Sequence, residues 1–276
     1  MYFYILDIAG MTNMNKKSII IVVILLILAF FICSCKTNIR QDINSSFNNS
    51  IEQKEESKVQ ITPFKFLTKD GFEIYSTLYQ VKNPKAQVLL LHGFRGKQED
   101  YAELTKILNE KDINVITLDF RGHGKSIFRT NIEINEQDLN LQDYTSLSSD
   151  LEGVIIYLDS KNLNSNFSIV GSDLGANVAL VFATKHNDSV KKLILLSPSQ
   201  NYYGVITTDT IKKYNNSLYI VTSVSDDLSY EGSKYLYDNS ISEDKEFKLY
   251  SSSGHGVQMF LYEMGLFDKV SFWLLK

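Results

Sequence analysis

A short turn between a strand and a helix constrains this chain more than any other feature. The apolar run at residues 167–170 predicts a buried strand, and the apolar-periodic segment at 174–185 predicts a helix. The turn between them, residues 171–175, reads Gly-Ser-Asp-Leu-Gly, and its two glycines leave room for close packing. A strand, a sharp turn and a helix in this order are the context of a nucleophile elbow, which lifts its central residue above the sheet edge.

The central residue of such a turn is usually serine or cysteine, and here it is Asp173. Ser172 does not replace it by a shift of one position, because Val170 and Leu174 would then stand where the turn requires small residues. An aspartate tolerates the left-handed backbone better than most residues, so the turn can still form. The helix that begins behind it favours the ionised carboxylate.

The composition is that of a globular chain with one substantial core. Its 276 residues are 44% hydrophobic and 22% charged, which is enough to bury such a core. The formal net charge is −4 and no basic cluster is present, so the composition argues against a nucleic-acid-binding protein. We expect neither a metal nor a cofactor, and we expect a small-molecule substrate as the partner.

The N-terminal segment has the pattern of a targeting signal. Two lysines at 16 and 17 precede an apolar run at residues 19–32, which is shorter than the roughly 17–25 residues of a membrane span and suits a signal peptide. The sequence Ile-Cys-Ser-Cys at 32–35 resembles the bacterial lipobox, so we expect Cys35 to be processed and lipidated. Cys33 fits less well because a bulky isoleucine precedes it. An uncleaved N-terminal anchor is the alternative.

These features divide the chain into three expected parts. Residues 1–34 are the signal peptide, 35–60 are the lipidated cysteine and a polar, disordered tether, and 61–276 are the folded domain. Both cysteines of the chain lie before the domain, so the domain has neither a disulfide nor a cysteine nucleophile. We expect an exported protein of the bacterial cell envelope, held at the membrane through its lipid anchor.

Apolar patterning within the domain predicts strands that alternate with helices. Residues 64–68 and 72–79 flank a Lys-Asp-Gly turn signal, which predicts a hairpin. Further strands are expected at 88–91, 115–118, 167–170, 193–196, 218–221 and 246–250. Helices are expected at 101–108, 147–158, 174–185, 230–237 and 257–275. This order predicts an α/β fold, with a mostly parallel central sheet, helices on both faces, and ligands beyond the carboxyl ends of the strands.

Five motifs at predicted strand ends resemble those of the α/β-hydrolase family, in that family's order, over residues 61–276. They are His-Gly-Phe-Arg-Gly at 92–96, Asp-Phe-Arg-Gly-His-Gly-Lys-Ser at 119–126, the turn at 171–175, Asp226, and Gly-His-Gly at 254–256. The resemblance implies the α/β-hydrolase fold. It also implies little or no cap, because only residues 197–217 separate two strands where a cap would be inserted.

The resemblance further implies roles for individual residues. His255 is the expected base, and Asp226 is the expected acid, which would hold the histidine tautomer and stabilise the imidazolium. Asp227 is the alternative acid. The backbone N–H groups of Phe94 and Leu174 would form an oxyanion hole.

Other polar side chains near these motifs are expected to play supporting parts. We interpret His92 and His123 as structural residues within their own loops. Tyr202, Tyr203 and Tyr214 lie in the 197–217 segment and are candidates for the contacts that a cap would otherwise supply.

Asp173 at the nucleophile position resembles the epoxide hydrolase and haloalkane dehalogenase branches of the family. There a carboxylate attacks a saturated carbon, and the histidine activates the water that hydrolyses the resulting ester. Attack on an ordinary ester or amide carbonyl would give an anhydride, which argues against a plain serine-type esterase or peptidase. However, Leu174, rather than the tryptophan of those branches, follows the aspartate.

Three functions remain open on the sequence. The first is a lipid-anchored hydrolase that uses Asp173, His255 and Asp226 on a small substrate. The second is a non-catalytic binding lipoprotein that keeps the hydrolase fold. The third is a relative of serine esterases or peptidases with lost or weak activity. We favour the first by analogy of fold.

Overall fold

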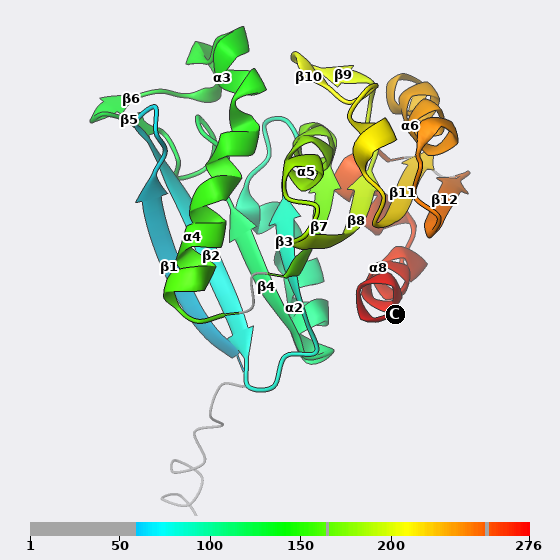
Figure 1. Ribbon diagram of the computed structural model, residues 1–276, viewed down its shortest axis with the longest axis horizontal. Coiled ribbons are helices and arrows are strands. Elements are labelled where there is room, and N and C mark those ends of the chain that lie inside the picture. Colours follow the sequence, from blue (N-terminus) through cyan, green and yellow to red (C-terminus); the bar gives the residue numbers. More distant parts are fainter. Residues whose placement is uncertain (1–58, 164–165, 252–253) are drawn as a thin grey trace, which may run out of the picture. The chain divides into compact units, whose positions relative to one another are not determined.

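The computed structural model describes residues 59–163, 166–251 and 254–276 (Figure 1). The expected signal peptide, Cys35 and all but the last two residues of the expected tether lie outside these ranges. In the part of the chain that is described, no helix is long and apolar enough to cross a membrane.

A ten-stranded sheet forms the centre of the domain, and six of its strands run parallel. In sheet order the parallel strands are β12 (Lys245–Tyr250), β11 (Ser217–Ser223), β8 (Val190–Leu196), β7 (Phe167–Ser172), β3 (Ala86–Leu91) and β4 (Ile113–Leu118). The antiparallel strands β2 (Phe72–Val81), β5 (Phe128–Arg129) and β6 (Ile132–Glu133) continue the sheet beyond β4. The mostly parallel sheet predicted from the alternating pattern is confirmed.

The predicted hairpin is present at the antiparallel end of the sheet. Strand β1 (Val59–Leu67) pairs with β2 in the register Val59 to Val81 and Leu67 to Glu73. Gly71 closes the turn with a φ of +90°, a conformation that favours glycine. The predicted domain start at residue 61 falls within β1.

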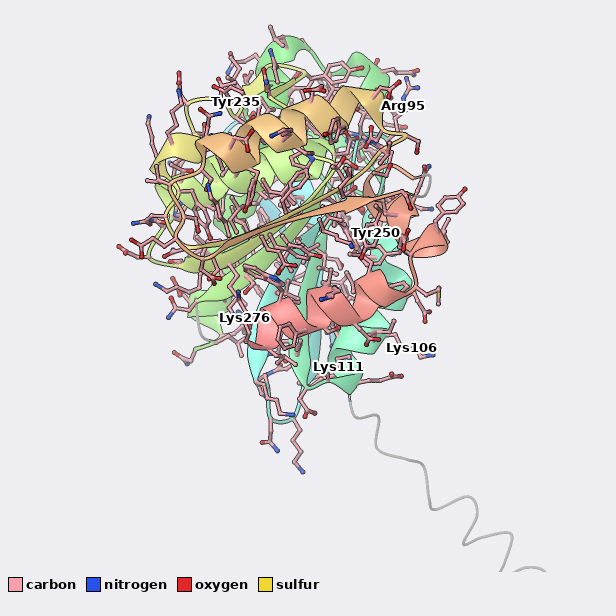
Figure 2. All side chains as sticks on the ribbon, turned by 90° about the vertical axis from the view of Figure 1, so that its right-hand side faces the viewer. Arg95, Lys106, Lys111, Tyr235, Tyr250 and Lys276 are labelled. Atoms are coloured by element: carbon pink, nitrogen blue, oxygen red, sulfur yellow. The ribbon has the colours of Figure 1, made fainter. Side chains whose placement is uncertain are left out.

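Two hydrophobic cores cover the two faces of the sheet, because neighbouring strand residues point to opposite sides. On β7, for example, Ile169 belongs to one core and Val170 to the other. The first core packs under α4 (Glu152–Ser160), α5 (Leu174–Lys185) and α6 (Asp227–Asn239). The second packs under α2 (Ala102–Glu110) and α8 (Gly265–Leu275), which lie side by side (Figure 2). Figure 2 labels Lys106 on α2, and Lys111 and Lys276 directly after α2 and α8.

Two predicted helices differ from the structure. The segment predicted as one helix at 147–158 begins as a 3₁₀ turn, Leu147–Leu151, before α4. The predicted closing helix at 257–275 is broken into a 3₁₀ turn (Gly256–Gln258), α7 (Met259–Tyr262) and α8. Glu263, which follows α7, has φ −125° and ψ 76°, outside the helical region. The sequence did not reveal this break, because Leu261 and Met264 continue the apolar pattern across it although both side chains are exposed.

Two short insertions follow strands of the parallel part of the sheet, and part of each lies above the carboxyl ends of those strands (Figure 1). The first follows β4 and contains β5, β6 and α3 (Leu141–Thr145). The second follows β8 and contains the hairpin of β9 (Asn201–Tyr202) and β10 (Val205–Ile206). Neither insertion is a full helical cap, which agrees with the small or absent cap expected from the sequence.

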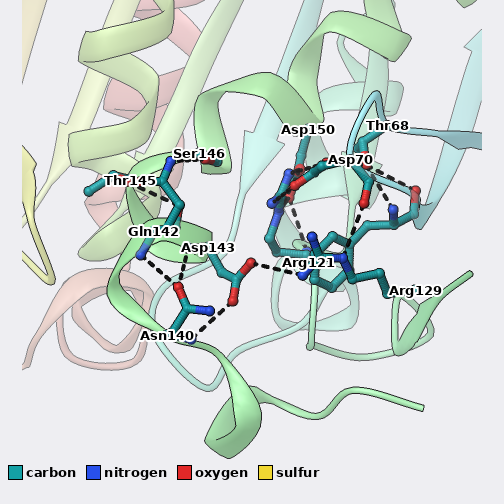
Figure 3. A network of polar contacts seen from close by, with 11 residues as sticks. Thr68, Asp70, Arg121, Arg129, Asn140, Gln142, Asp143, Thr145, Ser146 and Asp150 are labelled. Atoms are coloured by element: carbon teal, nitrogen blue, oxygen red, sulfur yellow. Dashed lines mark hydrogen bonds and ion pairs between the residues drawn. The ribbon is translucent and has the colours of Figure 1, made fainter. Parts of the chain in front are cut away.

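A buried arginine joins the β1–β2 turn to the segments after β4 and before α4 (Figure 3). The guanidinium of Arg121 donates to both oxygens of Asp150, at 2.9 and 3.2 Å from Nε, and its Nη1 lies 2.6 Å from Asp70 Oδ2. Arg121 and Asp150 are both inaccessible to solvent, and the guanidinium also lies over the ring of Phe72 at 4.5 Å. Removing Asp150 would leave the interior charge of Arg121 compensated only by the partly exposed Asp70.

We expect Asp150→Ala to lower the free energy of unfolding by about 3–5 kcal/mol, because it leaves the buried Arg121 guanidinium paired only with the partly exposed Asp70. Urea denaturation monitored by circular dichroism measures this change. Asp209→Ala serves as the control, since Asp209 is 83% exposed in its pair with Lys212, and it should change stability by less than about 0.5 kcal/mol. Equal effects of the two substitutions would contradict the assignment of Arg121 and Asp150 as a stabilising buried ion pair.

Candidate active site

Asp173 occupies a strained position at the turn between β7 and α5. Its φ is 55° and its ψ is −118°, which is not the left-handed helical region expected from the sequence but a more sparsely populated one. Such a conformation costs of order 1–3 kcal/mol and persists only where surrounding contacts hold it. The Asp173 N–H donates to Leu196 O at 2.8 Å, and its carbonyl accepts from Ala176 and Asn177 in the first turn of α5.

Three glycines allow the chain to approach itself around this turn. A Cβ atom on Gly171 would overlap the carbonyl oxygen of Gly175, and a Cβ on Gly175 would overlap that of His92, which follows β3. On Gly93, a Cβ would lie 3.1 Å from Asp173 Cβ. The two glycines of the elbow therefore serve the close packing that the sequence predicts for them.

The structure brings Asp173, His255 and Asp226 together at the carboxyl edge of the sheet. His255 Nε2 lies 3.1 Å from Asp173 Oδ1, and His255 Nδ1 lies 2.8 Å from Asp226 Oδ2. Asp226 follows β11 and His255 follows β12, so three separate strand ends supply the three side chains. Asp227, the alternative acid, is exposed as the first residue of α6, and Asp226 is the carboxylate that contacts the histidine.

The two carboxylates hold the His255 ring in its protonated form. Burial lowers the pKa of His255, but the hydrogen bonds and charges of Asp173 and Asp226 outweigh burial and raise it to about 10. Burial raises the pKa of Asp226, and hydrogen bonds from His255 and Ser197 bring it below its ordinary value. In the resting site His255 is therefore an imidazolium at neutral pH, and not a free base.

The second oxygen of Asp173 lies at the predicted oxyanion hole. Asp173 Oδ2 accepts a hydrogen bond from the Phe94 N–H at 3.0 Å. Leu174, which carries the other predicted N–H donor, is buried as the first residue of α5. The carboxylate thus presents one oxygen to a backbone donor and the other to the histidine.

His92 and Ser172 hydrogen-bond the backbone of the loops around the site. His92 Nδ1 donates to Gly93 O at 2.7 Å, and Nε2 accepts from the Phe120 N–H at 3.0 Å, so the ring ties two strand-end loops together. Burial lowers the pKa of His92 to about 3, which keeps this ring neutral. Ser172 Oγ accepts from the Val257 N–H at 3.0 Å and is only 2% exposed. His123, also buried, donates from Nδ1 to Arg121 O.

An aromatic cluster from both insertions lies beside the site. The ring of Tyr203 stacks on Phe94 at 4.8 Å between centroids and on Tyr144 of α3 at 4.7 Å. Burial, the charge of Asp173 and a hydrogen bond to that carboxylate raise the pKa of Tyr202. Tyr202 therefore keeps its proton next to Asp173, whereas Tyr214 is buried and donates to Ser217 O.

Sequence patterns indicated Tyr202 and Tyr203 only as candidates and missed Tyr144, because α3 is too short to show helical periodicity. Within residues 59–163, 166–251 and 254–276, no group of three or more His, Cys, Asp and Glu side chains is arranged to hold a metal ion.

Comparisons with known proteins agree with this architecture. A family model described as serine aminopeptidase, S33, matches residues 82–207, which include the elbow but neither Asp226 nor His255. An esterase from Pyrococcus furiosus superposes with a TM-score of 0.64 at 15% identity, covering 78% of this chain and 90% of the esterase. A monoglyceride lipase from Saccharomyces cerevisiae superposes with a TM-score of 0.60 at 16% identity, covering 80% of this chain and 95% of the lipase. The chain has the α/β-hydrolase fold.

Curated relatives share shorter stretches of sequence. A monoacylglycerol lipase of Xenopus laevis is 28% identical over 44% of this chain and 33% of its own length. A serine hydrolase-like protein of Dictyostelium discoideum is 24% identical over 70% of this chain and 46% of its own. A proline iminopeptidase of Thermoplasma volcanium is 30% identical over 45% of this chain and 39% of its own. The chain spans less than half the length of each of these relatives.

Asp173→Asn should lower the pKa of His255 by about one unit or more, because it removes one of the two charges on the ring. The raised pKa means that the ion pairs stabilise the fold fully below about pH 6.5 and lose this contribution as the pH rises through about 10. The wild type should therefore lose more stability than Asp173→Asn between pH 8 and 11.

Titration of the His255 imidazole by NMR and melting temperatures across this pH range measure both effects. Asp209→Asn is the control and should leave the His255 titration unchanged. A wild-type His255 that titrates near pH 6.5 would contradict the double ion pair.

Proposed function

We propose that this protein is a hydrolase that acts on a small substrate with Asp173 as the nucleophile, His255 as the base and Asp226 as the acid. The arrangement of the Asp173 carboxylate carries this proposal. Oδ2 accepts from the Phe94 N–H and Oδ1 faces His255 Nε2, so the group is oriented by both of its oxygens.

The first step would form an ester on Asp173. Oδ1 attacks a saturated carbon, a carbon–oxygen bond forms, and the bond to the leaving group breaks with its electron pair. The hydroxyl of Tyr202, protonated beside Asp173, is suited to donate a hydrogen bond to the departing group. The strained backbone of Asp173 and the amide contact to Oδ2 keep the attacking oxygen in place.

The second step would use a base that the first step creates. Esterification removes the negative charge of Asp173, so the pKa of His255 falls and the ring, which is 39% exposed, can release its proton to solvent. Neutral His255 then takes a proton from a water that adds to Cγ of the ester. The oxyanion forms on Oδ2, beside the Phe94 N–H, and collapse releases an alcohol and restores the carboxylate. For a leaving group that departs as an anion, the net reaction consumes one water and yields the alcohol, the leaving group and one proton. With an epoxide the leaving oxygen stays on the substrate and takes up that proton, so the product is a diol.

A serine-type acyl hydrolase with weak activity is the second candidate, and the named relatives favour it. The matched relatives and structures are named as lipases, esterases and peptidases. A carboxylate that occupies the oxyanion hole would compete with the oxyanion of such a reaction. The third candidate, a binding lipoprotein without catalysis, would keep the fold and bind a small molecule without turning it over.

Assays on simple epoxides and short-chain aryl esters distinguish these candidates. We expect the full chain, in detergent, to turn over an epoxide, and we expect Asp173→Asn to lower the rate by at least about 100-fold because it removes the attacking oxygen anion. His255→Ala should accumulate a covalent adduct on Asp173, visible as added mass in the intact protein. Asp209→Asn is the matched control.

Two outcomes would overturn the proposal that Asp173 is the nucleophile. One is a wild type inactive on both substrates while Asp173→Ser gains esterase activity, which supports the serine-type candidate. The other is the absence of both turnover and adduct in every variant, which supports the binding protein.

We also propose attachment to the membrane of the cell envelope through lipid on Cys35. Cys35→Ala should abolish signal-peptide processing and release the protein from the membrane fraction. Radiolabelled palmitate incorporation and fractionation measure these changes, with Cys33→Ala as the control. Unchanged processing and attachment in Cys35→Ala would contradict the lipoprotein assignment.

A further inference from the structure

Three buried serines hydrogen-bond the backbone of the segment that carries the base, residues 254–257, here termed the His255 loop. Ser223 Oγ donates to Gly254 O at 2.8 Å. Ser197 Oγ accepts from the Gly256 N–H at 2.9 Å, and Ser172 Oγ accepts from the Val257 N–H at 3.0 Å. All three serines are at most 2% exposed.

The order of these contacts follows the order of the strands. Ser223 ends β11, Ser197 directly follows β8, and Ser172 ends β7, and these three strands are neighbours in the sheet. The chain leaves the edge strand β12 and must reach Asp173 beyond β7, which lies about 14 Å away at about 4.8 Å per strand. The serines thus support the His255 loop at each strand that it crosses.

Ser197 differs from the other two serines because it also contacts the acid. Its hydroxyl is among the groups that hydrogen-bond the Asp226 carboxylate. A serine hydroxyl has one proton to donate and can accept as well, so Ser197 can accept from Gly256 and donate to Asp226 at the same time. Its N–H is fixed on Val221 O at 2.8 Å, and its φ of 53° is unusual for a residue with a side chain.

We propose that Ser197 is the positioning residue that sets His255 between its two carboxylates. One hydroxyl fixes both the loop that carries the ring and the carboxylate that binds Nδ1, so His255 Nε2 is held at the ion-pair distance of 3.1 Å from Asp173 Oδ1. Its effect on turnover rests on the proposed function, whereas its effect on the ring can be measured without turnover. A serine that merely fills space at the crowded strand end would be replaceable by alanine at no cost to the ring.

Ser197→Ala and Ser197→Gly test this role together. Both remove the hydroxyl, and the glycine variant adopts a φ of 53° without strain, so at least one variant should fold. Ser76→Ala is the control, because Ser76 is a buried serine whose hydroxyl has no hydrogen-bond partner among the described residues. The measurements are the NMR titration of the His255 imidazole and the hydrogen exchange of the Gly256 amide, both on the full chain in detergent.

We expect the pKa of His255 to fall by about one unit in both Ser197 variants, since the ring is no longer held against both carboxylates. The Gly256 amide should exchange about tenfold faster, as for the loss of one hydrogen bond. A folded Ser197→Gly or Ser197→Ala whose His255 titration matches Ser76→Ala would overturn the proposal. An inactive wild type with a shifted titration in these variants would instead overturn the proposed function alone.

Discussion

The protonated His255 ring between two carboxylates is the interaction on which the rest of the site depends. Asp173 follows β7, Asp226 follows β11 and His255 follows β12, so the sheet must deliver three distant segments to one edge. Without the positive charge, two carboxylates would face each other in a largely buried site. The ion pairs therefore balance the charges that the elbow and the start of α6 introduce, and they couple the protonation of His255 to the charge of Asp173.

Asp173 differs from a serine at the same turn in how it uses the Phe94 N–H. A serine leaves the amide of Phe94 free for an incoming oxygen, whereas the carboxylate already places Oδ2 on that amide. The same backbone geometry therefore suits an ester formed on the protein itself. The aromatic contacts of Tyr203 with Phe94 and Tyr144 place both insertions beside this carboxylate, so part of the surroundings of the site comes from these two insertions.

Much of the fold follows from local pattern in the sequence. Strands buried on both faces are nearly continuous apolar runs, and the glycines at 171 and 175 mark a turn that no larger residue fits. The site was predictable as far as the loops that carry Asp226 and His255. The stack of Tyr203 on Tyr144 was not, because it depends on two short insertions without periodicity meeting in space. Nor was the high pKa of His255, which depends on how closely two carboxylates approach one ring.

The position of β12 at the edge of the sheet makes the His255 side of the site easier to open than the Asp173 side. Asp173 directly follows β7, which has strands on both sides and a fully buried pattern, whereas β12, which precedes His255, is the last strand of the sheet and pairs with β11 alone. Edge strands open at lower free energy than central ones. Local opening of β12 would move His255 away from Asp173 while the turn between β7 and α5 stays folded. The protein can therefore lose its assembled centre in a local event, well before the domain as a whole unfolds.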